Sequence, residues 1–156
     1  MTGFIVNAPA ADPEEAPIVS GPFWPDVAPA VIRAAQRIDN TVTPERLRMA
    51  LIEAIACTNH ALRAWRQTQA DLGRTKLSAV PADEIDGKSL LEHRYLRAVG
   101  CLAKALLLER LRDFDATGKG DKKADALTDP IDDYRRDHLH ALADILSAPR
   151  TVVELI

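Results

Sequence analysis

The sequence contains few aromatic residues, few glycines and only two cysteines. Aromatic residues make up 4% of the 156 residues, whereas the helix formers Ala and Leu are abundant, so the composition favours helices over strands. With only seven glycines, the chain has few positions for the tight glycine turns of phosphate-binding or catalytic sites. Two cysteines are too few for a disulfide framework. Because Cys57 and Cys101 both fall in apolar helical patterns, we expect buried thiols rather than a redox pair.

A long apolar run and a large excess of charge are also absent. No run approaches the ~18 apolar residues of a membrane span, and the N-terminus lacks the basic region of a secretory signal. We therefore expect a protein that is made and used in a cytoplasm. The net charge of −3 argues against a general nucleic-acid binder, whose surface is basic.

The charge is unevenly distributed along the chain. Residues 27–77 carry eight bases and four acids, whereas residues 113–147 carry nine acids and five bases. Opposed charges within a nearly neutral chain are compatible with head-to-tail contact between identical subunits.

The length indicates one domain, and the apolar periodicity indicates a small all-α bundle of about four helices within residues 27–147. The expected helices cover residues 29–38, 44–72, 88–113 and 122–147. Thr43 is a good N-cap for the second helix, and Gly73 is a plausible stop. The third helix has the widest apolar surface, so we expect it at the centre of the bundle. Pro130 should break or kink the fourth helix or begin a new first turn.

Both ends of the chain differ from the bundle. Residues 1–26 are rich in proline and acids and contain no base, so we expect an extended N-terminal arm. Phe23 and Trp24 lie in this arm, and rings of this size dock either on the chain's own core or on a neighbouring subunit. Residues 148–156 should form an extended C-terminal tail that covers the bundle or adds to a partner. The expected partner-binding residues are therefore Phe23, Trp24, Val152, Val153, Leu155 and Ile156.

Candidate metal and catalytic sites are weak. Asp113, Asp115, Thr117 and Gly118 match the first half of a calcium-binding loop, but Ala124 stands where that loop requires a bidentate Glu. A polar turn is the better interpretation. His138 and His140 would point in opposite directions on a helix and cannot share a metal ion. No nucleophile pattern or phosphate loop is present, so we expect no enzyme, no cofactor and no metal.

One alternative function is a DNA-binding regulator or packaging factor. It would use four arginines near the start of the bundle, Arg33, Arg37, Arg46 and Arg48. Pro44 and Glu45 make the second helix a poor recognition helix for a helix-turn-helix.

Seven segments carry a resemblance to a known family: residues 23–39, 41–48, 59–66, 85–89, 98–104, 112–121 and 145–156. In this order, they resemble the phage head completion protein family (gpL type) of contractile-tailed phages. The resemblance begins at Phe23 and continues to the last residue, and it depends on the order of the segments rather than on any chemical motif.

The resemblance implies a structural head–tail connector with no catalytic residues. Copies would form a ring, expected to be twelvefold, beneath the portal protein after DNA packaging. The ring would stabilise the filled head and offer a docking surface for the tail, so a tail terminator or tail completion protein is a further expected partner. Packaged DNA would pass through the channel without sequence-specific binding. The expected locations are the head–tail junction of the virion and, during assembly, the host cytoplasm, without a membrane.

Overall fold

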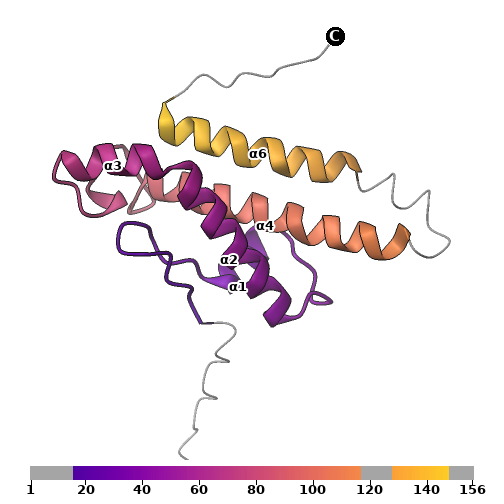
Figure 1. Ribbon diagram of the computed structural model, residues 1–156. Coiled ribbons are helices and arrows are strands. Elements are labelled where there is room, and N and C mark those ends of the chain that lie inside the picture. Colours follow the sequence, from indigo (N-terminus) through magenta and orange to yellow (C-terminus); the bar gives the residue numbers. More distant parts are fainter. Residues whose placement is uncertain (1–15, 117–127, 148–156) are drawn as a thin grey trace, which may run out of the picture.

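The computed structural model describes residues 16–116 and 128–147, without the side chains of residues 112–116 and 128–129 (Figure 1). This part of the chain is mostly helical and contains one small hairpin, which confirms the predicted all-α class. The elements are α1 (Pro29–Ala35), α2 (Pro44–Ala61), α3 (Arg63–Asp71), a 3₁₀ turn (Leu77–Ala79), β1 (Glu84–Ile85), β2 (Lys88–Ser89), α4 (Leu90–Ala116) and α6 (Thr128–Leu146).

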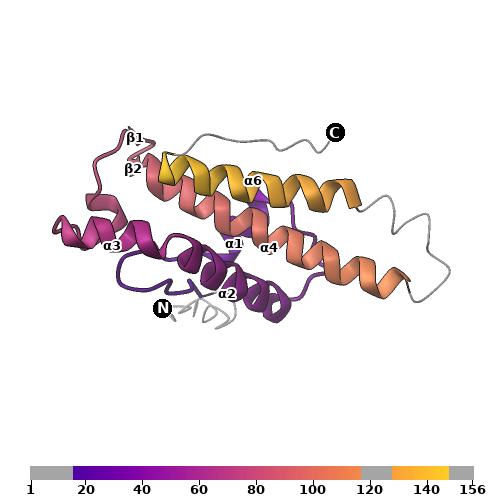
Figure 2. The same ribbon diagram turned by 45° about the horizontal axis from the view of Figure 1, so that its top comes forward.

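Helix α4 is the central element, as the sequence predicted. Helix α6 runs alongside it on one side, and α2 crosses it on the other, with α1 on the side away from α6 (Figures 1 and 2). The middle of α4 is almost completely enclosed, and its small residues allow both neighbouring helices to approach closely. The buried residues there are Tyr95, Ala98, Val99, Cys101, Leu102, Ala103 and Ala105.

The helix predicted over residues 44–72 is interrupted at Leu62 and forms α2 and α3. Leu62 is completely buried at the junction, and Gln69 of α3 is also buried, so both helices contribute to the core. The predicted ends are confirmed. Thr43 Oγ1 accepts a hydrogen bond from the Arg46 amide, and Gly73 closes α3 with a positive φ of 80°.

Residues 73–87, expected to be a linker, contain the 3₁₀ turn and the first strand of a hairpin. Asp86 and Gly87 have φ angles of 52° and 69°, which is the geometry of a two-residue turn that matches strand twist. The sequence indicated this turn but not the strands, because each strand is only two residues long. His93, on the first turn of α4, contacts the Ile85 carbonyl at 2.8 Å and holds the hairpin against the helix.

The N-terminal strap, residues 16–27, also lies against the bundle. Ile18 and Val27 exchange backbone hydrogen bonds of 2.8 and 2.9 Å, so the strap folds back on itself. The sequence placed the boundary between arm and bundle at residue 26, whereas the packed part of the chain already includes residue 16. The physical reason is the burial of four apolar side chains, Ile18, Phe23, Trp24 and Val27.

The two cysteines lie in different environments. Cys101 is buried as predicted, but Cys57 is exposed on the outer side of α2, so the prediction of a core thiol is wrong there. Pro130 lies in the first turn of α6, where it leaves no interior hydrogen bond unmade. No helix within residues 16–116 and 128–147 is long and apolar enough to cross a membrane.

Candidate functional site

Phe23 and Trp24 lie in an aromatic cluster within the chain's own core. The Trp24 ring stacks on Tyr95 with 4.8 Å between centroids and 8° between planes, and the Phe23 ring meets Trp24 edge-on at 4.8 Å. Trp65 of α3 completes the cluster. Because Phe23 and Trp24 are 5% and 7% exposed, neither ring offers a surface to a neighbour in this conformation.

Polar contacts hold the strap across two helices. Tyr95 donates a hydrogen bond of 2.7 Å to the Asn59 side-chain oxygen, and the Asn59 amide donates one of 2.9 Å to the Ser20 carbonyl. Burial raises the pKa of Tyr95 to about 12, so the hydroxyl remains a donor at every physiological pH. These two hydrogen bonds therefore join the strap, α2 and α4 into one unit.

Val152, Val153, Leu155 and Ile156 lie outside the described residues, as does the half-matching calcium loop after Ala116. The last described residue, Ser147, directly follows α6 with a φ of 53°. The partner-binding role of these residues stays a prediction.

The pairing of α4 with α6 combines apolar packing with ion pairs. Arg97 and Asp137 approach to 3.5 Å, Arg135 and Glu109 to 2.5 Å, and the Arg94 guanidinium donates to the Asp144 carbonyl at 3.0 Å. Exposed pairs of this kind contribute about 1 kcal/mol or less each. Most of the stability of the α4–α6 pairing therefore comes from the buried side chains of α6. These are Ile131, His138, Ala141, Leu142 and Ile145.

His138 is the one buried titratable side chain in this pairing, among the described residues of α6. Its Nδ1 lies 2.9 Å from the Ala98 carbonyl, which requires Nδ1–H to donate. Burial lowers the pKa of His138, and the nearby Arg135 acts in the same direction, whereas the hydrogen bond to Ala98 raises it. The folded chain therefore favours the neutral ring.

This depressed pKa predicts that acid destabilises the protein. The unfolded chain binds a proton at His138 more readily than the folded chain, so stability is complete above the ordinary His pKa of about 6.5 and decreases below it. Urea unfolding at pH 7.5 and pH 5.5 measures this loss for the wild type and for His138→Gln. The variant should lose less stability over the same interval, and an equal loss in both proteins would contradict the prediction.

The described residues contain no cluster of three or more His, Cys, Asp or Glu side chains placed to hold a metal ion. The buried His138 contacts a backbone carbonyl, whereas His140 is half-buried. The free thiol of Cys101 is buried, and burial raises its pKa, which disfavours the reactive thiolate.

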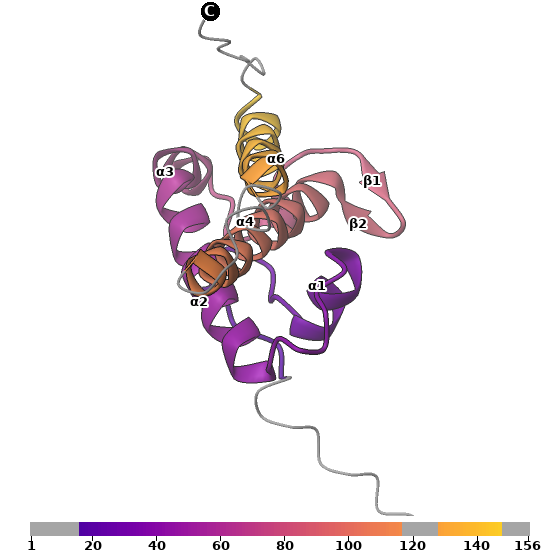
Figure 3. The same cartoon turned by 90° about the vertical axis from the view of Figure 1, so that its right-hand side faces the viewer.

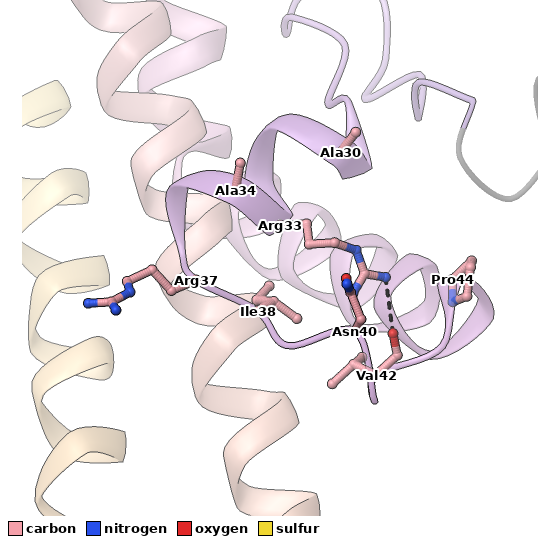
Figure 4. A pocket seen from close by; sticks show the side chains of 8 residues that line it. All are labelled: Ala30, Arg33, Ala34, Arg37, Ile38, Asn40, Val42 and Pro44. Atoms are coloured by element: carbon pink, nitrogen blue, oxygen red, sulfur yellow. Dashed lines mark hydrogen bonds between the residues drawn. The ribbon is translucent and has the colours of Figure 1, made fainter.

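A shallow hollow of roughly 580 Å³ lies between α1 and the loop that leads into α2 (Figure 4). Arg33 borders it, but its guanidinium donates to the Asp39 and Val42 carbonyls at 3.0 Å each. Arg37 points away from Arg33 and the loop. The two arginines that line the hollow therefore do not point together toward a common substrate position.

The same contacts weaken the DNA-binding alternative. The Arg48 guanidinium donates to the Ala16 carbonyl at 2.8 Å, so both Arg33 and Arg48 serve in holding the chain's own backbone. Only Arg37 and Arg46 of the four arginines project as exposed side chains. Half of the proposed DNA-binding arginines are therefore engaged within the chain itself.

Two features of the surface were not predicted as sites from the sequence. The basic residues around α3 are exposed or half-buried, and the acidic residues of the hairpin are exposed. Each group contains one exposed apolar side chain, Leu72 or Ile85. The uneven charge along the chain was the available sign of both features. Their positions in space required the fold.

Known proteins resemble this chain over nearly its whole length. A family model described as phage head completion protein (GPL) matches residues 18–156. A relative from Escherichia phage P2, named "Head completion/stabilization protein", is 42% identical over 152 residues, which cover 97% of this chain and 89% of the relative. No solved structure matches. The match includes the strap from residue 18 onward and confirms the resemblance indicated by the segments. The chain belongs to the phage head completion protein (GPL) family.

Proposed function

We propose that this protein completes the phage head by joining the portal ring after DNA packaging. There it stabilises the filled head and offers the tail a docking surface. The observation that supports this function best is the family match over residues 18–156, together with the name of the P2 relative. The protein acts through assembly rather than catalysis, and it resides at the head–tail junction of the virion after assembly in the host cytoplasm.

In this proposal, several copies form a ring that extends the DNA channel. The joined strap, α2, α4 and α6 supply a stiff subunit, because helices packed on both sides of α4 leave it little freedom to bend. A nearly neutral net charge of −3 suits a channel through which DNA slides without sequence-specific binding. The portal protein and a tail terminator or tail completion protein are the other partners.

We assign the contact with a partner to the C-terminal tail rather than to the aromatic pair. Phe23 and Trp24 could bind a neighbour only if the strap left the core, which would expose both rings. Val152, Val153, Leu155 and Ile156 form an apolar stretch with β-favouring residues, which suits addition to another chain. The tail then acts as a latch on the portal protein or on a neighbouring subunit.

Light scattering on a sizing column tests the proposal directly. We expect a ring-sized species for the protein alone, or one that forms only when the portal protein of its phage is added. The mass of that species would give the number of copies. A monomer that is indifferent to the portal protein would contradict the proposed function.

A further inference from the structure

The end of the molecule where α4 begins carries a basic surface on one flank. The α3 surface comprises residues 63–76, that is, α3 and the turn that follows it. Its charged residues are Arg63, Arg66, Arg74 and Lys76 against the single acid Asp71. Within the described residues, Arg63, Arg66 and Lys76 form no ion pair, so their charges are available to a partner. Leu72 is 63% exposed at the end of the helix.

The other flank of the same end carries an acidic surface. The hairpin surface comprises residues 83–88, in which Asp83, Glu84 and Asp86 oppose the single base Lys88. All six residues are exposed, and within the described residues none of the three acids forms an ion pair. Ile85 is 54% exposed between Glu84 and Asp86. The hairpin surface therefore has the opposite charge from the α3 surface and a matching exposed apolar side chain.

The two surfaces lie on different sides of the molecule. Figure 3 shows α3 on one side of the α4–α6 pair and the β1–β2 hairpin on the other, and in Figure 2 the two lie apart at the end where α4 begins. A chain therefore cannot bring its own two surfaces together, whereas two adjacent copies can. Contact between two different surfaces of identical chains is heterologous, and it forms a ring when the rotation between copies closes.

We propose that adjacent copies of this chain meet head to tail, with the α3 surface of one copy against the hairpin surface of the next. This inference rests on the proposed function, because it names the subunit contact of the same assembly. The opposed charges orient the two copies, and Leu72 and Ile85 provide apolar area between them. Duplex DNA is a poorer occupant, since only the α3 surface has the charge that phosphates require.

Charge reversal tests the contact in the assembled phage. The α3-reversed variant carries Arg63→Glu and Lys76→Glu, and the hairpin-reversed variant carries Asp83→Lys and Glu84→Lys. Asp86 is left unchanged because its φ of 52° suits Asp better than Lys. Each variant replaces the wild-type protein in infected cells, and the yield of DNA-containing heads is counted. Circular dichroism of the purified variants confirms that each one folds.

Each variant alone should lower the yield at least about 100-fold, because like charges then meet at every contact between copies. A chain with all four substitutions has complementary surfaces again and should restore most of the yield. Expression of the two variants together should also restore it, because the copies can alternate. Asp132→Lys, which changes an exposed acid of α6, is the control and should not reduce the yield.

The contact is refuted if either folded variant assembles as well as the wild type, or if the fourfold variant is no better than its parents. The second result is also the one expected if the α3 surface binds DNA or the portal protein. If heads retain their DNA without the wild-type protein, the proposed function fails, whatever the variants do. The two failures are therefore distinguishable.

Discussion

Replacing Trp24 by Ala should lower the free energy of unfolding by about 3–5 kcal/mol, the usual cost of removing a large buried aromatic ring. The side chain is 7% exposed and stacks on Tyr95, so its removal leaves a cavity beside the completely buried centre of α4. A domain of this size has a total stability of only about 5–15 kcal/mol, so the loss is a large fraction of it. Urea unfolding followed by circular dichroism measures the change.

Val19→Ala is the matched control for this prediction. Val19 belongs to the same strap but is 76% exposed, so its truncation should change stability by less than about 0.5 kcal/mol. Trp24→Phe should lie between the two, because it keeps an aromatic ring in the cluster. Equal urea midpoints for Trp24→Ala and Val19→Ala would show that the strap does not belong to the folded core.

Deletion of residues 150–156 should cause filled heads to lose their DNA while the bundle remains folded. The deletion removes the apolar residues of the proposed latch and leaves all described residues unchanged. Stability in urea should therefore stay close to that of the wild type, whereas the fraction of heads that retain DNA should fall sharply. Counting DNA-containing heads after infection, with unfolding measured on the purified protein, separates the two effects.

Two full-length variants refine this prediction. Thr151→Ala with Glu154→Gln changes only polar residues of the tail, so DNA retention should persist. Val152→Asp with Leu155→Asp keeps the length but makes the tail polar, and it should behave like the deletion because the apolar contact is lost. If heads with the deleted tail keep their DNA as well as the wild type, the latch proposal is wrong.

Helix positions were predictable because they depend on local periodicity and on caps. The apolar stripe of α2 repeats at three- and four-residue steps, and Leu47, Leu51 and Ala54 are all completely buried, as that repeat requires. Thr43 and Gly73 mark ends that the structure confirms. The interruption at Leu62 was not predictable, since Leu62 itself fits the stripe and the break depends on how α3 packs.

The composition of the strap predicts an extended arm, whereas its residues pack against the bundle in the structure. Its prolines and acids are typical of an extended arm, and it contains no helix or long strand. Its docking depends on Tyr95 and Asn59, which are distant in the sequence and approach only when α2 crosses α4. Likewise, Cys57 follows the apolar pattern of α2 closely enough to suggest burial, yet it lies on the outer side of the helix.

By itself, the sequence determined the all-α class, the extent of most helices and the family, because each depends on residue order along the chain. Only the tertiary structure decided which side chains are buried, which are engaged in contacts and which surfaces lie apart. It buried Phe23 and Trp24, engaged Arg33 and Arg48 with backbone carbonyls, and placed α3 and the hairpin on opposite flanks. The physical reason is that burial and surface charge are properties of neighbours in space, and those neighbours come from segments that lie far apart in the sequence.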